Sequence, residues 1–397
     1  RAMPRIVGLG DPVTDVVYHA SRDAIVALLR DAHDAHDADE VEIGGCVPVS
    51  ARELRALVRA IPERDAVVSP GGSAANVLKG IAQCAADDAS STTSCVFVGT
   101  VDGRDDVGAA YGDALRRARV ESALMAYEGD DASDAEGENG MIGSARCVCL
   151  VDDRGQRTMR TYLGASAKTR ADDLPSEALR SADVLHAEGY ALYKPDVLAR
   201  ACALAKENSA LVSLDLASFE VVRHCRDALR ETLESGVVDV IFCNEDEARE
   251  LVRGIDDDGC ARAQESHPQL NGRDVERPSE ETELAALAYL LRYVKLAVCS
   301  RGKRGCVAMN AEGERSESRA EGVEAIDTTG AGDTFTSGFL HAYLAGGSLR
   351  QCGDAGCAAG AEVVQVRGAE MDDDRWRRVR EKIAIILGKE RSPSATT

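Results

Sequence analysis

Short apolar runs separated by amphipathic stretches mark most of the chain. The first run, residues 6–9, breaks at Gly10 and resumes as an alternating strand through Val13, Val16 and Val17. Further nearly continuous apolar runs occupy residues 182–190, 210–218, 239–244 and 295–300. Helical periodicity separates them, at residues 195–208, 221–235 and after 244. Because strands buried on both faces are continuously apolar, this alternation predicts a doubly wound α/β domain with a mostly parallel sheet.

The N-terminal half of the chain has a less regular pattern. Helices are expected at residues 23–40, 50–61 and within 69–86, and a strand that ends at Gly99. Two strands, at 145–153 and 156–164, are joined by a hairpin at 153–155. The segments of about 11–20 and 143–165 are therefore predicted to form a small β-sheet lid. Residues 128–140 are expected to form a charged loop, 256–281 a surface insertion and 388–397 a flexible tail.

Composition limits the class of protein. The chain has 397 residues, 44% of them hydrophobic, which is typical of a globular protein with a sizeable core. No apolar run approaches the length of about 18 residues that spans a bilayer. The formal net charge of −21 argues against partners such as nucleic acid or an anionic membrane surface. The 13 cysteines lack zinc spacing and are interpreted as reduced thiols of a soluble intracellular protein, in the cytoplasm or an organelle stroma.

One stretch combines small residues with a carboxylate at the start of a helical pattern. Gly330, Ala331 and Gly332 directly precede Asp333, and an apolar periodic segment follows. Asp333 could simply cap that helix. Alternatively, the free N–H groups and glycines form a cradle for an anion, with Asp333 as a general base beside it.

Other polar residues also follow predicted strands or turns. Asp15 comes after the first strand, Gly71 and Gly72 precede a helix that carries Asn76, and residues 244–247 follow a buried strand. Ligands of open parallel sheets bind beyond the carboxyl ends of the strands, so these places are candidate sites. Each also has a structural reading: Asn76 as a helix cap, Gly71-Gly72 as a turn, and Glu247 as compensation of a helix dipole.

Two motifs give the sequence a family resemblance. "DTTGAGDTFTSGF" resembles the C-terminal signature of the PfkB, or ribokinase-like, carbohydrate and nucleoside kinases, and "SPGGSAANVLKGIA" resembles their N-terminal di-glycine motif. The segments "FVGTVDGRDDVG", "RTMRTYLGAS", "LHAEGY", "FCNEDEA" and "SRGKRG" follow in the family's order. "TYLGAS", "EGY" and the "GDPVTD" opening are most similar to the adenosine kinase-like branch. No Walker motif is present. The resemblance implies one ribokinase-like domain over residues 5–387.

The resemblance also implies roles for individual residues. Catalysis would involve Asp333 as base and the amides of Gly330, Ala331 and Gly332 as anion hole. Substrate hydroxyls would be held by Asp15, Gly71, Gly72 and Asn76. The nucleotide side would comprise Asn244, Ser300, Gly302 and Gly305. Glu247 would organise Mg²⁺ through water, and Asp327, with Thr328, would bind a monovalent cation such as K⁺.

The expected activity is transfer of a phosphoryl group from ATP to a hydroxymethyl group. Adenosine or a related ribonucleoside is the first expectation for the acceptor, and a free sugar such as ribose or fructose the second. Base stacking would need an aromatic residue, for which Phe219, Tyr190 and Tyr193 are candidates. Two departures from the branch leave the identity of the phosphate acceptor undecided. Asp11 stands where the branch usually has Asn, and Lys79 interrupts a helix of small residues. The alternative to a kinase is a catalytically silent subunit of a larger assembly. A homodimer formed through the lid is a further possibility for the oligomeric state.

Overall fold

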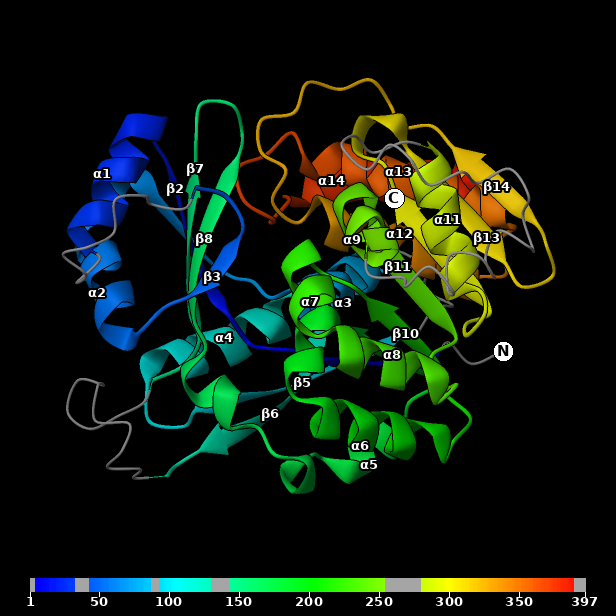
Figure 1. Cartoon of the computed structure of the whole chain (residues 1–397), viewed down its shortest axis with the longest axis horizontal. Coiled ribbons are helices and arrows are strands. Elements are labelled where there is room, and N and C mark those ends of the chain that lie inside the picture. Colours follow the sequence, from blue (N-terminus) through cyan, green and yellow to red (C-terminus); the bar gives the residue numbers. More distant parts are fainter. Residues whose placement is uncertain (1–3, 33–42, 87–92, 130–142, 254–279, 389–397) are drawn as a thin grey trace, which may run out of the picture.

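The computed structural model describes residues 4–32, 43–86, 93–129, 143–253 and 280–388. Two β-sheets organise these residues, a larger one covered by helices and a smaller one beside it (Figure 1). The expected loop at 128–140, the insertion at 256–281 and the tail at 388–397 lie almost entirely outside the described residues.

The larger sheet has nine strands among the described residues, in the order β14-β13-β12-β11-β10-β9-β1-β5-β6. Every neighbouring pair from β12 to β6 is parallel, and β13 and β14 continue the sheet antiparallel. The strands are β1 Arg5–Leu9, β5 Ser94–Asp102, β6 Val120–Tyr127, β9 Val184–Glu188, β10 Leu211–Asp215, β11 Val240–Asn244, β12 Leu296–Ser300, β13 Cys306–Asn310 and β14 Arg315–Ser318. The predicted mostly parallel, doubly wound sheet is confirmed.

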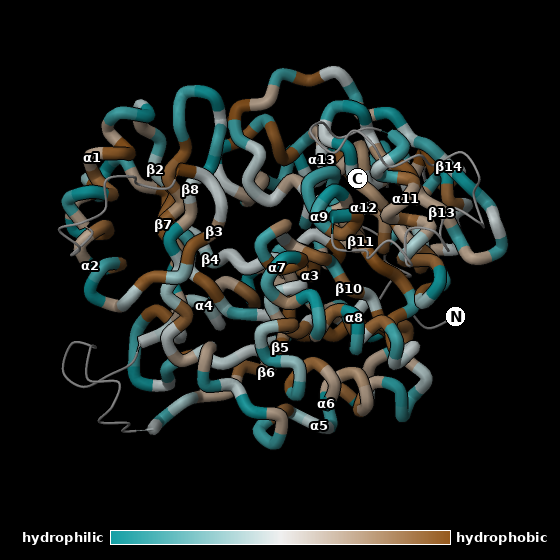
Figure 2. Tube along the Cα trace, in the orientation of Figure 1, coloured by the Kyte–Doolittle hydropathy of each residue, from teal (hydrophilic) through white to brown (hydrophobic). Residues whose placement is uncertain are grey.

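Helices cover both faces of this sheet. On one face pack α5 (Ser176–Arg180), α6 (Pro195–Lys206), α7 (Phe219–His224), α8 (Arg226–Glu234), α9 (Glu245–Arg253) and α11 (Glu280–Leu290). On the other pack α3 (Ser73–Cys84), α4 (Asp106–Arg117), α12 (Ala331–Leu344), α13 (Leu349–Val363) and α14 (Asp373–Ile386). Because side chains alternate along a strand, Val7 joins the first core and its neighbour Ile6 the second. Figure 2 shows hydrophobic segments through this interior and hydrophilic segments on the periphery.

Small residues bring α3 and α12 into direct contact. A Cβ atom on Gly80 of α3 would collide with Ser337 of α12. The Ser337 hydroxyl donates to the Val77 carbonyl oxygen at 3.0 Å, which joins the two helices. On its other side α12 packs against α13, where a Cβ on Gly338 would lie 2.6 Å from the carbonyl oxygen of Ala355. This packing places the N-termini of α3 and α12 beside each other.

The smaller sheet has five strands in the order β3-β8-β7-β2-β4. They are β2 Thr14–His19, β3 Cys46–Pro48, β4 Ala66–Pro70, β7 Arg146–Val151 and β8 Arg157–Tyr162. Helices α1 (Arg22–Ala32) and α2 (Ala51–Ala60) cover one face of this sheet. The predicted lid segments omitted β3, β4 and both helices. The edge strand β4 exposes Val67 and Val68. The expected pairing of two copies through the lid stays a prediction.

Several predicted boundaries were wrong. Strand β5 continues past Gly99 to Asp102, because its last residues stay buried and keep pairing with β6. The single helix expected at 221–235 is two helices, α7 and α8, which meet at Cys225. In the described part of the chain, no helix has the length and apolar character that crossing a membrane requires.

Candidate active site

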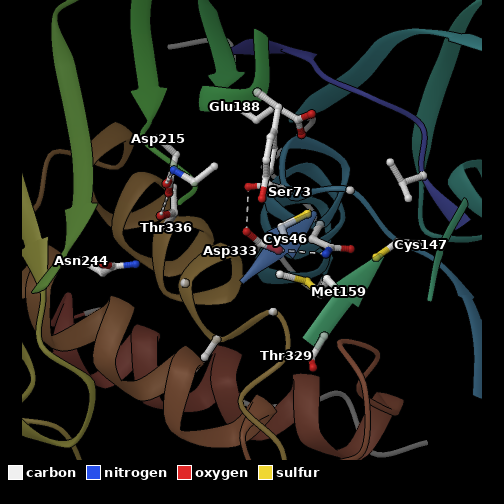
Figure 3. Close-up of a pocket in the computed structure, with 18 of the residues that line it drawn as sticks. Cys46, Ser73, Cys147, Met159, Glu188, Asp215, Asn244, Thr329, Asp333 and Thr336 are labelled. Atoms are coloured by element: carbon white, nitrogen blue, oxygen red, sulfur yellow. Dashed lines mark hydrogen bonds between the residues drawn. The ribbon is translucent and has the colours of Figure 1, made fainter. Parts of the chain in front are cut away.

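A cavity of about 250 Å³ lies at the carboxyl ends of the larger sheet's strands, between them and the smaller sheet (Figure 3). The first turns of α3 and α12 form part of its wall, and β2, β7 and β8 of the smaller sheet form another part. Eleven of the predicted site residues line this one cavity: Asp15, Gly72, Asn76, Asn244, Glu247, Ser300, Thr328, Gly330, Ala331, Gly332 and Asp333. Gly71, Gly302, Gly305 and Asp327 are not part of its lining.

Asp333 is held by two side chains from α3. The Ser73 hydroxyl donates to one carboxylate oxygen at 2.8 Å (Figure 3). The Asn76 side-chain amide donates to the other at 2.9 Å. Helix α12 has Gly330 as its N-cap and no side-chain cap, and α3 has Gly72 as its N-cap. The alternatives in which Asp333 or Asn76 caps a helix are therefore wrong, because both side chains are bonded to each other across the two helices.

The two glycines at the start of α12 have different structural requirements. Gly330 has φ 72°, in the left-handed region, and an added Cβ would lie 2.6 Å from the Cβ of Ala369. Gly332 is exposed, and an added Cβ would meet nothing within 4 Å. Backbone conformation and contacts within the protein therefore explain why residue 330 is glycine, but they do not explain why residue 332 is glycine. Its neighbour Ala331 already donates its amide to the Thr328 carbonyl at 3.2 Å, so Gly332 and Asp333 carry first-turn amides free of that bond.

The acidity of Asp333 suits a proton acceptor. Burial raises the pKa of its carboxyl above the usual range, while the hydrogen bonds from Asn76 and Ser73 lower it. A carboxylate with a raised pKa accepts a proton more readily, and the two donors fix its direction.

Asp15 presents a second carboxylate to the cavity from β2. Burial raises its pKa to about 7, opposed by the charge of Lys79 and reinforced by that of Asp333. Gly71 lies behind it: a Cβ there would collide with the Asp15 carboxylate, and the Gly71 carbonyl accepts from the Tyr111 hydroxyl at 2.7 Å. Gly71 therefore supports Asp15 instead of facing the cavity.

Glu188, at the end of β9, is a cavity residue that the sequence analysis did not single out. Its carboxylate accepts the backbone N–H of Asp11 at 2.7 Å and that of Ala74, in the first turn of α3, at 2.9 Å. Burial and the charge of Asp11 raise the pKa of Glu188 to about 8. Asp11 in turn accepts from Lys194 at 2.7 Å. These bonds join the β1–β2 loop to the helix that carries Ser73.

Asn244 and Glu247 form a capping box at the start of α9. The Asn244 side-chain oxygen accepts the N–H groups of Asp246 and Glu247, and the Glu247 carboxylate accepts both the backbone and side-chain N–H of Asn244. Glu247 is also buried, and it lines the cavity, as does Asp215. Burial, together with the charge of Asp215, raises the pKa of Glu247 well above its usual range. Glu247 thus has a capping role. No cationic side chain is among the causes of the pKa shifts of Glu247 and Asp215, the two carboxyls at this end of the cavity.

This pair fits a water-mediated Mg²⁺. Burial raises the pKa of Asp215 to about 6, even though it accepts from the Ala217 amide and the Thr336 hydroxyl. Within the described chain, no group of three or more His, Cys, Asp or Glu side chains gathers as a set of metal ligands. Mg²⁺ commonly keeps several waters and uses one or two carboxylates plus substrate phosphates, which is what Glu247 and Asp215 offer.

The Gly302–Gly305 loop lies outside the cavity wall but is fixed next to Ser300. Arg304 pairs with Glu245 and with the buried Glu283, and Arg301 pairs with Glu317. These ion pairs join the loop to α9, α11 and β14. The loop is therefore held by charge next to Ser300, and the nucleotide-binding roles predicted for Ser300, Gly302 and Gly305 stay predictions.

The smaller sheet contributes residues that the sequence analysis also missed. The cavity is lined by Cys46 of β3, Cys147 of β7 and Met159 of β8 (Figure 3). Arg157 of β8 also lines it. Of the three aromatic candidates, Tyr190 lines the cavity, whereas Tyr193 and Phe219 are not among its lining residues. Asp215 and Glu188 end strands, so the rule that selected Asn244 points to them as well. No such signal exists for residues on the smaller sheet.

Comparison with known proteins agrees with this geometry. The family described as pfkB family carbohydrate kinase matches residues 49–375. A nucleoside kinase of Methanocaldococcus jannaschii is 31% identical over 114 residues, 29% of this chain and 37% of that protein. An adenosine kinase of Schizophyllum commune is 25% identical over 340 residues, 80% of this chain and 85% of that protein.

A solved structure extends the agreement to the fold. The crystal structure of adenosine kinase from Sinorhizobium meliloti matches with a TM-score of 0.75 and 24% identity, over 96% of this chain and 99% of that one. The large sheet with flanking helices and the smaller second sheet are thus those of ribokinase-like kinases. The chain belongs to the pfkB family of carbohydrate kinases, and it is a phosphotransferase that acts on a sugar or nucleoside hydroxyl group.

Proposed function

We propose that the protein transfers the γ-phosphoryl group of ATP to the hydroxymethyl group of a ribonucleoside, with adenosine as the first candidate. The observation that carries this proposal is the placement of Asp333. Its carboxylate, bonded by Ser73 and Asn76, stands in the first turn of a helix whose N-terminus opens into the cavity. A proton acceptor and an anion-binding helix end thus occupy the same few residues.

The reaction follows from this placement. The acceptor hydroxyl oxygen attacks the γ-phosphorus while Asp333 takes its proton, and the bond to the β-phosphate oxygen breaks to release ADP. The first-turn amides of α12 stabilise the charge on the transferring group. Gly332 keeps that approach free of a side chain, because its Cβ position is open. Asp15 accepts hydrogen bonds from the acceptor's other hydroxyl groups.

Glu247 and Asp215 are the residues that would hold Mg²⁺ through water. When bound, the ion neutralises phosphate charge and orients the leaving group. The charge of Asp215 raises the pKa of Glu247, and a bound cation would lower the pKa values of both carboxyls. Asn244 keeps Glu247 in place through the capping box.

A nucleoside acceptor is favoured by the wall that the smaller sheet provides. Val13, Cys46, Cys147 and Met159 form an apolar, sulfur-rich surface, and Tyr190 adds an aromatic ring. A flat purine or pyrimidine base buries well against such side chains, whereas a free sugar would leave them in contact with water. The name of the Schizophyllum commune relative agrees with this choice. A free sugar such as ribose or fructose is the second candidate.

Arg157 gives the smaller sheet a role in phosphoryl transfer. It lines the cavity from β8, and its charge lowers the pKa values of both Asp15 and Asp333. An arginine in this position pairs with a phosphate oxygen once the nucleotide is bound. Movement of the smaller sheet toward the larger one would narrow the cavity around Arg157 and exclude water, so that the sheet acts as the lid of a single domain over residues 5–387.

The test is ADP release from Mg²⁺-ATP with a panel of nucleosides and free sugars. We expect the highest kcat/KM with adenosine and a loss of about 10³-fold in Asp333→Asn, because the proton acceptor is removed. Asp196→Asn is the matched control, an exposed carboxylate in the first turn of α6. A higher kcat/KM with ribose or fructose than with adenosine would make the free sugar the acceptor in place of the nucleoside. Equal background rates of wild type and Asp333→Asn with every acceptor would support the silent subunit.

A further inference from the structure

Lys79 follows Asn76 by three residues on α3, so the two side chains lie on the same face of the helix. A second cavity, of about 210 Å³, adjoins this face, and its lining includes Asn76, Lys79 and Thr334, the residue after Asp333. Asn76 also lines the active-site cavity, whereas Lys79 does not. Lys79 is therefore separated from the active-site cavity by the side chain that holds Asp333.

The ammonium group of Lys79 bonds the turn that precedes α3. It donates to the carbonyl oxygen of Pro70 at 2.6 Å, and its side chain is only 12% exposed. Pro70 ends β4 directly before Gly71, which lies against the Asp15 carboxylate. The bond therefore fixes the backbone that supports Asp15.

The same ammonium group also reaches a loop behind the other helix end. It donates to the carboxylate of Glu370 at 3.1 Å. Glu370 belongs to the loop of residues 364–372, between α13 and α14, in which Ala369 lies against Gly330 at the start of α12. Lys79 thus connects the turn before α3 to the loop that backs the N-terminus of α12.

The positive charge of Lys79 acts on two carboxylates of the active site. Burial raises the pKa values of Asp15 and Asp333, and the charge of Lys79 opposes this rise in both. Lys79 is carried by the helix that itself bonds Asp333 through Ser73 and Asn76. The other charged groups that face these side chains are Arg157 of β8 and Asp215 of β10, with Arg117 of α4 and Glu370 at the cavity of Lys79.

We propose that Lys79 is a positioning residue for phosphoryl transfer: its ammonium group fixes the turn before α3 and keeps Asp333 ionised, ready to accept the proton. It acts through Pro70, Asp15 and Asp333, since it does not line the cavity that holds the substrates. The kinetic test rests on the proposed function, and the unfolding test does not.

The kinetic test compares the pH dependence of kcat/KM in Lys79→Met, Lys79→Arg, Glu370→Gln and the wild type, with the acceptor that the wild type uses best. Met keeps the apolar stem but has neither charge nor donor. We expect Lys79→Met to lower kcat/KM by about threefold at pH of about 8.5 and about 30-fold at pH of about 6, because the acid limb moves up by about one pH unit. Lys79→Arg and Glu370→Gln retain the positive charge, so neither should move the limb upward. Lys295→Met, a lysine paired with Asp239 at the amino end of β12, is the matched control and should behave as the wild type.

Urea unfolding gives a second measure that needs no acceptor. Without the charge of Lys79, the folded-state pKa values of Asp15 and Asp333 lie further above their unfolded values, so more stability is lost as pH rises. The urea midpoint of Lys79→Met should therefore fall further below the wild-type midpoint at pH of about 8 than at pH of about 5. Loss of the Pro70 bond alone would lower the midpoint equally at both pH values.

Each outcome decides the proposal. Equal losses of kcat/KM at every pH, together with a constant difference in urea midpoint, would leave Lys79 a merely structural side chain and overturn it. An acid limb of Lys79→Arg that coincides with that of Lys79→Met would also overturn it. If Lys79→Met does not fold, Lys79→Gln, which is neutral but keeps N–H donors, must show the upward shift. If no acceptor is phosphorylated, the proposed function fails, and the pH dependence of the urea midpoint still decides whether the charge of Lys79 acts on the buried carboxylates.

Discussion

Replacing Asp15 by Asn separates the stability of the fold from the activity of the site. The Asp15 carboxyl lies in the cavity without a hydrogen-bond donor among the influences on its pKa, which are burial and the charges of Lys79, Asp333 and Arg157. Asn has nearly the same shape but no charge to bury. We therefore expect Asp15→Asn to fold more stably than the wild type and to bind the acceptor poorly.

The magnitude follows from the pKa of Asp15. It rises from 3.8 to about 7 on folding, a difference of about 3 units, or about 4 kcal/mol at about 1.4 kcal/mol for each unit. Water in the cavity reaches part of the side chain, so we expect about half of this value. Because the folded pKa lies above the unfolded one, the folded state holds the proton longer. The free energy of unfolding therefore falls as pH rises from about 4 to about 7, and the penalty is complete above that range.

Urea unfolding followed by circular dichroism measures the effect. Asp15→Asn should exceed the wild type in the free energy of unfolding by about 1 kcal/mol at pH of about 5.5 and about 2 kcal/mol at pH of about 8. Its kcat/KM should fall by about 10- to 100-fold, since a charged hydrogen bond to the acceptor is lost. Asp172→Asn, at an exposed position, is the control. A stability difference that does not grow with pH, or a less stable variant at pH of about 8, would refute the reasoning.

Two further predictions concern the helix ends. Gly332→Ala should unfold at the wild-type urea concentration because its Cβ meets no atom within 4 Å, yet its kcat should fall by about tenfold or more as the methyl group blocks the phosphate approach. Gly330→Ala should instead lose about 2 kcal/mol of stability through its left-handed φ and the contact with Ala369. Equal stability and equal kcat of the two variants would contradict the different structural requirements of Gly330 and Gly332. Glu188→Gln should lose about 1–3 kcal/mol in urea unfolding, because one amide group would face a backbone N–H donor. An unchanged midpoint for Glu188→Gln would mean that those bonds do not hold the β1–β2 loop.

The larger sheet was predictable because burial on both faces makes each strand continuously apolar. The rule that ligands bind at the carboxyl ends of strands then located Asn244, and it applies equally to Glu188 and Asp215, which also end strands. Strands β3 and β4 were missed because β3 has three residues and β4 buries only one of its five, so neither shows a buried pattern. Nothing in the local sequence shows how the smaller sheet docks, and hence that Arg157 and Met159 reach the cavity.

Residue spacing also failed to show which polar groups bond each other. Ser73 and Asn76 lie about 260 positions from Asp333 in sequence, and they meet it only because Gly80 and Ser337 let α3 and α12 pack closely. The alternative of a local cap was reasonable for Asp333 from its place in the sequence, since Asp is common at helix starts. Helix packing, a long-range property, decided against it.

The two helices that begin at the cavity meet the same physical problem in different ways. Both α3 and α12 have a glycine N-cap and no side-chain cap, so the N–H groups of their first turns need acceptors. For α3 the protein supplies one, since the Glu188 carboxylate accepts the N–H of Ala74. At α12 the one carboxylate in the first turn, Asp333, is instead turned toward Ser73 and Asn76. The N-terminus of α12 is thus kept for an anion that the protein does not carry, and in a kinase that anion is the phosphoryl group in transit.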